Sequence, residues 1–156
     1  MLQIEIPDFP TLRLQYLVLD YNGTLGLDGE ILPGARARLK RLATQLVIHV
    51  VTGDTFAKAG SCLAGVSCKL TILPPPDQSE AKRSHVEQLG SSACVCIGNG
   101  RNDRLMLQTA VLAIAVVQRE CAWTETLMAA DVIATNVCDA LDLLIYPQRL
   151  VATLRG

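Results

Sequence analysis

The chain has 156 residues, of which 50% are hydrophobic and 19% are charged, and its formal net charge is -1. This composition excludes a disordered chain, and the balance of charge excludes a broad basic surface for nucleic acid or an anionic membrane. The length predicts one domain over residues 1–156 with a substantial core. Because half of the chain is apolar, we also expect a homo-oligomer.

The N-terminal segment carries Glu5 and Asp8 and has no basic stretch before an apolar run, so we expect no signal peptide. The longest purely apolar stretch, 111–117, is too short to cross a bilayer. These features predict a cytoplasmic protein with no membrane contact. The six cysteines lack zinc-binding spacing and are expected to be reduced, with Cys94 and Cys96 buried on one face of a strand.

Apolar runs and helical patterns alternate along the chain. An N-terminal strand or hairpin arm is expected within residues 1–14, leading into a buried strand that ends at Asp20. Further strands are expected at 46–51, 69–73, 93–97, 112–117 and 132–134, and helices at 33–44, 55–63, 79–89, 101–108, 119–129 and 138–144, with Ser79 as a helix cap. This alternation predicts an α/β fold, a Rossmann-like three-layer α/β/α sandwich with a central parallel sheet.

Three polar clusters follow buried strands: Asp20 to Thr24, Thr52 to Asp54, and Gly98 to Asp103. Each cluster alone could be an ordinary turn or helix cap, because Asp, Asn, Gly and Thr are common there. The carboxyl ends of parallel strands share one edge of a sheet, so we expect the three clusters to meet and to bind a ligand.

The segments LVLDYNGTLGLDG, VVTGDT and CIGNGRND, with Lys82 between the last two, resemble the four ordered motifs of haloacid dehalogenase-like (HAD-like) phosphotransferases. The TGD triplet and the GxGxND ending most resemble small soluble proteins that are similar to the phosphorylation domain of P-type ATPases. The resemblance extends by motif from Tyr16 to Asp103. It implies a HAD-like fold and a Mg²⁺-dependent phosphohydrolase that forms an aspartyl-phosphate.

The residue types in these motifs suit that chemistry. Asp20 is the candidate nucleophile, because a carboxylate can attack a phosphoryl group when nearby charge is offset. Oxygen ligands suit Mg²⁺, so Asp20, the backbone carbonyl of Asn22 and Asp103 are candidate metal ligands, and the resemblance adds the Asn99 side chain. The hydroxyl of Thr52 and the backbone N–H of Gly53 could hold a phosphate oxygen.

The remaining charged and titratable side chains receive other roles. Lys82 is expected to neutralise charge at the site, with the neighbouring Arg83 as the competing candidate. Asp54 fits a helix cap better than a metal ligand. His49 and His85 have no sequence partner that suggests catalysis, and both are expected to be structural.

Two positions depart from the pattern of the phosphatases that the chain resembles. Asn22 stands where those enzymes usually have a second aspartate, which protonates the leaving group and activates water; an amide can orient a group but cannot exchange a proton. Asn99 also stands where the pattern has Asp, which removes a negative charge from the metal site. We therefore expect slow turnover. P-type ATPases resemble this case, because they also carry a non-acidic residue at the position of Asn22, which lets their phosphoenzyme persist. The alternative is a catalytically impaired HAD-fold binding or regulatory protein.

The segments between Thr24 and Thr52 and between Thr52 and Lys82 are too short to hold a cap domain. They also leave no room for the nucleotide-binding domain of a P-type ATPase, so the chain is not expected to be a pump. Without a cap the site would be open, which suits a large substrate such as a phosphoprotein, or else another subunit supplies the missing wall. The expected substrate is a phosphorylated small molecule or a phosphoprotein.

Overall fold

A six-stranded parallel sheet forms the centre of the molecule, in a computed structural model that describes residues 1–156. Its strand order is β10-β9-β8-β3-β6-β7, and every neighbouring pair is parallel. The strands are β3 (Tyr16–Leu19), β6 (Val47–Thr52), β7 (Cys68–Ile72), β8 (Cys94–Gly98), β9 (Leu112–Val116) and β10 (Val132–Ala134).

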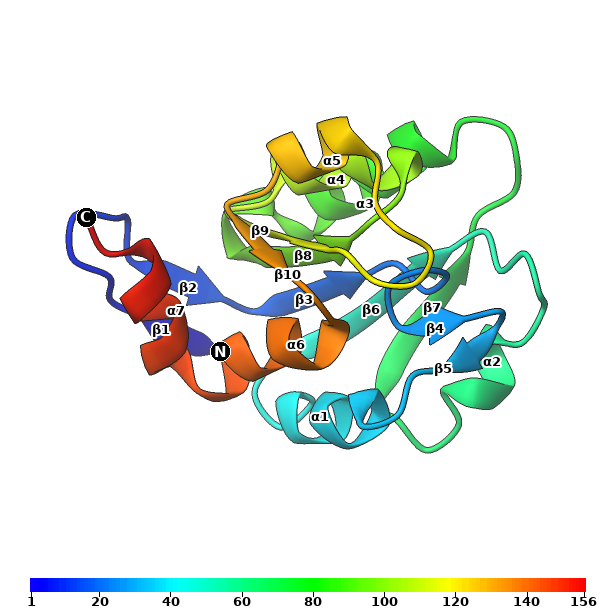
Figure 1. The fold of residues 1–156 in the computed structure, drawn as a ribbon, viewed down its shortest axis with the longest axis horizontal. Coiled ribbons are helices and arrows are strands. Elements are labelled where there is room, and N and C mark those ends of the chain that lie inside the picture. The colour runs from blue at the N-terminus through cyan, green and yellow to red at the C-terminus, as the bar shows by residue number, and fades with distance from the viewer.

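Helices cover both faces of this sheet (Figure 1). One face carries α1 (Ala35–Leu42) and α6 (Val137–Ile145), and the other carries α3 (Gln78–Leu89), α4 (Arg104–Thr109) and α5 (Thr124–Met128). The remaining elements are α2 (Ala59–Cys62), α7 (Pro147–Leu154), the 3-10 turns η1 (Ser91–Ala93) and η2 (Arg101–Asp103), and the hairpins β1 (Leu2–Ile4) with β2 (Leu12–Leu14) and β4 (Gly26–Leu27) with β5 (Glu30–Ile31). The expected three-layer α/β/α architecture is confirmed, including the N-terminal arm.

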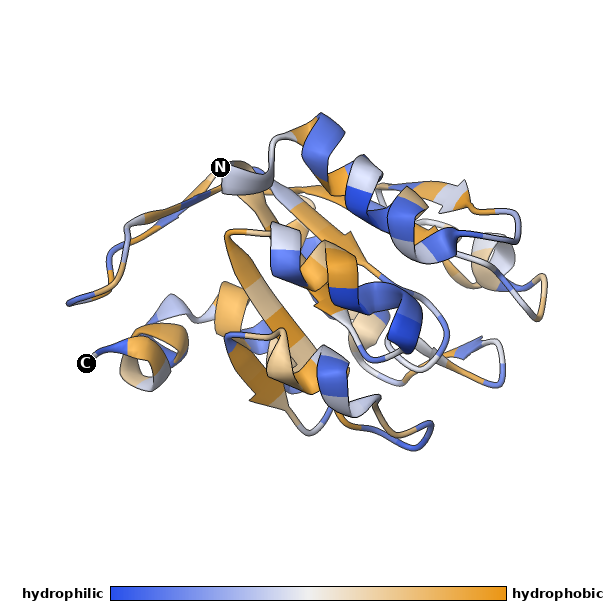
Figure 2. Ribbon diagram, turned by 90° about the horizontal axis from the view of Figure 1, so that it is seen from above, coloured by the Kyte–Doolittle hydropathy of each residue, from blue (hydrophilic) through white to orange (hydrophobic).

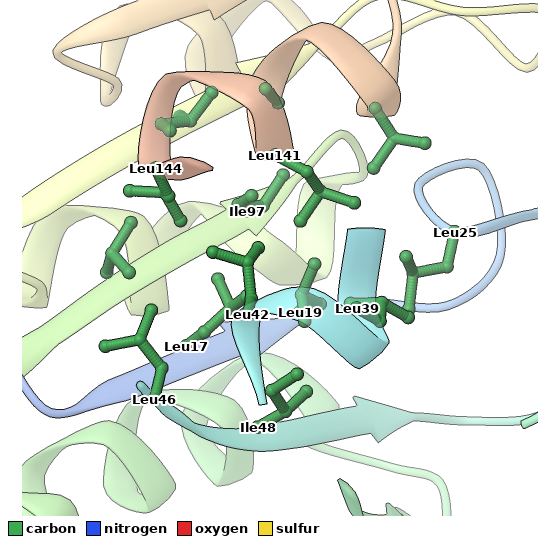
Figure 3. Packing of buried hydrophobic residues seen from close by; sticks show 14 of the residues in the cluster. Leu17, Leu19, Leu25, Leu39, Leu42, Leu46, Ile48, Ile97, Leu141 and Leu144 are labelled. Atoms are coloured by element: carbon green, nitrogen blue, oxygen red, sulfur yellow. The ribbon is translucent and has the colours of Figure 1, made fainter. Parts of the chain in front are cut away.

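Strands buried on both faces explain the continuous apolar runs of the sequence. Successive strand residues point to opposite sides, so Leu17 and Leu19 pack toward α1 and α6 (Figure 3), whereas Val18 packs in a second cluster with α3 and α4. Cys94 and Cys96 lie fully buried in that second cluster, as expected, and all six cysteines are free. In Figure 2 the strands are mainly hydrophobic, while hydrophilic residues concentrate on the helices and loops outside them.

Two helices are shorter than their sequence patterns predict. The helix expected at 55–63 is only α2, because Asp54 and Ala57 have left-handed backbones (φ 45° and 53°) that a helix cannot contain. The helix expected at 119–129 is only α5, because Cys121 has a φ of 61°. In both places the chain forms a loop beside the carboxyl edge of the sheet.

Other boundaries also differ from expectation. Ser79 does not cap its helix, because α3 begins one residue earlier and Asp77 occupies the N-cap position. Asp54 is not a helix N-cap as expected, because Lys58 occupies that position of α2. Its carboxylate nevertheless accepts the N–H groups of Lys58 and Ala59 at the helix start, both at 3.1 Å. Helix α7 and the hairpin of β4 and β5 were not predicted. No helix of the fold is long and apolar enough to span a membrane.

His49 and His85 contact each other on the α3 side of the sheet. The Nδ1 atom of His49 lies 2.9 Å from Nε2 of His85, and the Nε2 atom of His49 is buried without a partner. Burial lowers the pKa of His49 to about 4, with His85 and Lys69 adding to the effect, and burial also lowers the pKa of His85. Both rings are therefore uncharged in the folded protein near neutral pH.

Acid should therefore destabilise the fold through this pair. A histidine whose folded pKa is depressed contributes full stability above its unfolded pKa near 6.5, and loses it as the pH falls toward 4. For His49 alone we expect a loss of about 2 kcal/mol between pH 8 and pH 5. Urea unfolding at both pH values would measure this loss, and His49→Gln should lose less than the wild type. Equal losses in the two proteins would show that His49 does not titrate this way.

Candidate active site

The sheet reverses its strand order between β3 and β8. From β3 the chain winds outward through β6 to β7, then returns to β8 and winds the other way to β10. Ligands of open α/β sheets bind at such a switch point, outside the carboxyl ends of the strands. Asp20 directly follows β3, Thr52 ends β6 and Gly98 ends β8. The three polar clusters therefore lie on one edge of the sheet, as expected.

A buried lysine joins two of these clusters. The Nζ atom of Lys82, on α3, lies 2.6 Å from Oδ1 of Asp20 and 2.6 Å from Oδ1 of Asp103. The side chains of Lys82 and Asp103 are 0% exposed, and that of Asp20 is 8% exposed. Two carboxylates thus share one ammonium group, which leaves one excess negative charge in a buried site.

The pKa values reflect this imbalance. Burial and the charge of Asp103 together raise the pKa of Asp20 to about 7, because the Lys82 ammonium offsets only part of their effect. Burial by itself would lower the pKa of Lys82, but the carboxylates of Asp103 and Asp20 raise it above its ordinary value. Lys82 is therefore charged at neutral pH, and an additional cation would favour the ionised form of Asp20.

The Asp103 carboxylate is fixed by the backbone of its own loop. Its Oδ2 atom accepts the N–H groups of Asn99 at 2.9 Å and Gly100 at 2.8 Å, while Oδ1 faces Lys82. A Cβ atom at Gly98 would lie 2.6 Å from the carboxyl carbon of Asp103. Only glycine at the end of β8 therefore leaves room for this carboxylate.

The two asparagines lie in the same region but differ in their contacts. The Oδ1 atom of Asn22 is buried and has no hydrogen-bond partner. The Asn99 side chain is bonded at both ends, since its Oδ1 accepts the Thr24 hydroxyl at 3.1 Å and its Nδ2 donates to the Cys121 carbonyl at 3.0 Å. The Asn22 oxygen is thus available to a ligand, whereas Asn99 also ties the loop after β3 to the loop after β9.

Thr52 and Gly53 lie beside this group at the end of β6. The Thr52 hydroxyl oxygen accepts the N–H of Asp54 at 3.0 Å and keeps its own hydrogen for another acceptor. A Cβ atom at Gly53 would lie 2.6 Å from Nε2 of Gln78, so a side chain there would displace the end of the Gln78 side chain. Both residues can therefore present a hydroxyl and a backbone N–H to an anion.

Arg83 does not enter the site. Its guanidinium makes ion pairs of 3.1 Å with Glu80 and 3.4 Å with Glu87 on the outer face of α3. Lys82 is therefore the only one of the two candidates whose charge reaches Asp20.

Gln118, just after β9, is a positioning residue that the sequence patterns did not reveal. Its Nε2 atom donates to the carbonyls of Gly23 and Thr24, both at 2.9 Å, and its Oε1 atom accepts the N–H of Val137 at 2.7 Å. One side chain thus fixes the loop that follows Asp20 against the start of α6. No local sequence motif predicts this role, because all three partners are backbone groups of distant segments.

The donors at the site fit a divalent cation that prefers oxygen. Asp20 and Asp103 supply carboxylates with excess negative charge, and the backbone carbonyl of Asn22 follows two residues after Asp20. Such hard oxygen ligands, completed by water and phosphate, are typical of Mg²⁺. No group of three or more His, Cys, Asp or Glu side chains gathers to hold a metal, so these two carboxylates would act with amide oxygens and non-protein ligands.

Two solved structures share this fold. The Moraxella catarrhalis 3-deoxy-D-manno-octulosonate 8-phosphate phosphatase, crystallised with magnesium and phosphate ions, matches with a TM-score of 0.67 and 18% identity over 92% of this chain and 94% of that one. The cobalt-bound Haemophilus influenzae phosphatase for the same compound matches with a TM-score of 0.72 and 16% identity, over the same shares. The chain therefore has the HAD-like hydrolase fold, with no cap domain, and the fold expected from its motifs is confirmed.

Sequence comparison gives two relatives, and no family model matches. The chain is 46% identical over 61 residues to the uncharacterized protein MJ0073 of Methanocaldococcus jannaschii, covering 39% of this chain and 66% of that protein. It is 26% identical over 137 residues to the phospholipid-transporting ATPase NEO1 of Saccharomyces cerevisiae, covering 88% of this chain but 10% of the ATPase. The chain thus matches less than two thirds of the length of either relative. The second match agrees with the resemblance to P-type ATPases.

Proposed function

We propose that this chain is a Mg²⁺-dependent phosphohydrolase that acts through an aspartyl-phosphate on Asp20. The observation that carries the proposal is the buried Lys82 ammonium, 2.6 Å from both Asp20 and Asp103 at the switch point of the sheet. A carboxylate can attack an anionic phosphoryl group only where positive charge offsets both. Phosphatases with this fold that were crystallised with magnesium or cobalt ions support the choice of a divalent metal.

The proposed reaction has two displacements. In the first, an oxygen of Asp20 attacks phosphorus, the ester P–O bond breaks, and the alcohol leaves with the electron pair of that bond and takes up a proton from water. The Thr52 hydroxyl and the Gly53 N–H would hold a phosphate oxygen. In the second, water attacks phosphorus, the bond to Asp20 breaks, and phosphate is released with the carboxylate restored. Lys82 balances charge in both steps.

Asp20, the backbone carbonyl of Asn22, the Asn99 side chain and Asp103 would hold the metal ion. When bound, it would neutralise phosphoryl charge as a Lewis acid. The raised pKa of Asp20 gives the reason for needing such a cation at neutral pH, because part of the carboxyl population would otherwise be protonated.

A binding or regulatory protein is the second candidate. Two amides at the site favour it: Asn22 cannot exchange a proton with a leaving group, and the Asn99 amide already bonds Thr24 and Cys121. Such a protein would bind phosphate esters without becoming phosphorylated.

Hydrolysis of para-nitrophenyl phosphate, with and without Mg²⁺, tests the choice. This substrate has a good leaving group and least needs a general acid. We expect metal-dependent turnover that Asp20→Asn abolishes and that Asp28→Asn, the same change at an exposed turn, leaves intact. Acid-quenched protein should carry phosphate on Asp20. Turnover no greater than that of Asp20→Asn at saturating Mg²⁺, with no phosphorylated protein, would favour the binding protein.

A further inference from the structure

A cavity of about 530 Å³ lies beside the candidate active site. Its walls come from five segments: the loop after β3, the β4 strand of the small hairpin, the loop between β5 and α1, the loop after β9, and the residues around the start of α6. The lining includes Gly23, Leu27, Leu32, Gln118, Glu120 and Val137. Its volume falls in the range of pockets that hold small organic molecules, roughly 300–1,000 Å³.

Gly23 belongs both to the cavity wall and to the loop that follows Asp20. A Cβ atom at Gly23 would lie 2.4 Å from Nδ2 of Asn99 and 2.8 Å from Oε2 of Glu120. A residue of the candidate metal site and a residue of the cavity thus approach the same glycine. The cavity therefore adjoins the candidate metal site at this loop, within reach of the alcohol portion of a phosphate ester held at Asp20.

The chemistry of the lining distinguishes this cavity from its neighbour. Leu27, Leu32 and Val137 give it an apolar wall, and the exposed Arg119 and Glu120 at its edge form no ion pair. A second cavity, of about 730 Å³, is lined mainly by polar and charged residues, among them Arg101. The first therefore suits an organic group with an apolar face, and the second, which presents charges of both signs, suits a polar chain such as a phosphopeptide.

The walls are already held in place. The three hydrogen bonds of Gln118 connect the loop at Gly23 to the N–H of Val137, and so fix two opposite walls to each other. The Tyr21 hydroxyl donates to the Gly29 carbonyl at 2.9 Å and holds the small hairpin that carries Leu27. Because a preformed pocket costs little ordering on binding, this cavity can select a ligand without a cap.

We propose that this cavity binds the alcohol portion of a small phosphate monoester, and that the substrate is a small molecule with an apolar or aromatic face. The inference rests on the proposed function, because it assumes that the phosphoryl group binds at Asp20. Within that function it decides between the two substrate classes, small phosphate esters and phosphoproteins. Leu27, Leu32 and Val137 are then the residues that determine specificity.

Binding of non-hydrolysable phosphonates tests this assignment without requiring turnover. The affinities of methylphosphonate and benzylphosphonate would be measured by calorimetry with the Mg²⁺-loaded protein. We expect benzylphosphonate to bind about tenfold or more tightly, because its ring loses apolar surface to the cavity. Leu27→Trp, which fills the cavity, should erase this preference. Thr135→Trp, at an exposed position of the rim, is a second filling variant that does not alter the hairpin.

Arg101→Ala in the second cavity is the matched control and should leave the preference intact. The cavity assignment would be overturned if the two phosphonates bound with equal affinity, or if both filling variants still preferred benzylphosphonate. Neither result would contradict phosphate binding at Asp20. Tight binding of a phosphopeptide that Arg101→Ala abolishes, with no preference for benzylphosphonate, would overturn it in favour of a phosphoprotein. If neither phosphonate binds, both the cavity assignment and the proposed function fail.

Discussion

Asn22→Asp is expected to raise the rate of phosphate ester hydrolysis, by about 10²- to 10⁴-fold if a general acid–base is all that the site lacks. The Asn22 oxygen is buried and unpartnered, so a carboxyl group fits there without breaking a hydrogen bond. Burial and the nearby negative charges of Asp20 and Asp103 should raise the pKa of this new carboxyl and keep it able to donate a proton. The gain should be greater for an alkyl phosphate than for para-nitrophenyl phosphate, because the alkoxide leaving group needs the proton more.

Asn99→Asp is the matched control, since it makes the same chemical change at the same site. It should not increase turnover in this way, because it removes the N–H donor that the Cys121 carbonyl accepts, and its Oδ1 already accepts the Thr24 hydroxyl. An unchanged rate in Asn22→Asp with the metal bound would show that a missing acid is not the reason for slow hydrolysis. The binding or regulatory function would then gain support.

Lys82→Met is expected to abolish turnover and to destabilise the fold by about 3–5 kcal/mol. The substitution leaves the carboxylates of Asp20 and Asp103 buried and without their shared cation, and a buried charge that loses its partner is strongly unfavourable. Urea unfolding at neutral pH in the absence of metal would measure the change in unfolding free energy. Para-nitrophenyl phosphate hydrolysis would measure the change in activity.

Two further variants make this result specific. Arg83→Met, one residue along on the outer face of α3, should change the unfolding free energy by less than about 1 kcal/mol because its ion pairs are exposed. Adding Asp20→Asn to Lys82→Met should restore part of the lost stability, because it removes one of the two buried carboxylates that have lost their partner cation. A Lys82→Met protein as stable as the wild type would contradict a central ion pair in the folded state.

The resemblance to P-type ATPases concerns the phosphorylation chemistry and not transport. The match covers 10% of the yeast ATPase, so nothing about its transport activity follows for this chain. Between Thr24 and Thr52 the structure places the β4–β5 hairpin and α1, and between Thr52 and Lys82 it places α2 and β7. Neither interval contains a further domain, as the sequence spacing predicted.

The sequence alone determined the layers of the fold and the edge at which the site lies. Leu17 to Leu19 and Val95 to Ile97 form continuous apolar runs, which indicated strands buried on both faces. Asp20 and Gly98 stand where those runs end, and parallel strands place such ends together. The small hairpin could also have been predicted, because Asp28 and Gly29 form a dipeptide typical of a two-residue turn.

The ends of the helices needed the tertiary structure. Residues near Asp54, Ala57 and Cys121 follow helical patterns, yet each of these three residues has a left-handed backbone. The loops that result carry tertiary contacts, such as the Cys121 carbonyl that accepts from Asn99. Local patterning does not contain these long-range bonds, and it therefore overestimated both helices.

The choice between side chains also depended on the tertiary structure. Lys82 and Arg83 are adjacent cations, and only the direction of α3 relative to the sheet decides that Lys82 is buried against Asp20 while Arg83 faces the exposed glutamates. The role of Gln118 is decided in the same way, because its partners are the backbone groups of Gly23, Thr24 and Val137. Sequence determined which chemical groups reach the edge of the sheet, since that depends on strand ends and residue type. Tertiary structure decided which of them touch, since that depends on helix rotation and on contacts between segments far apart in the chain.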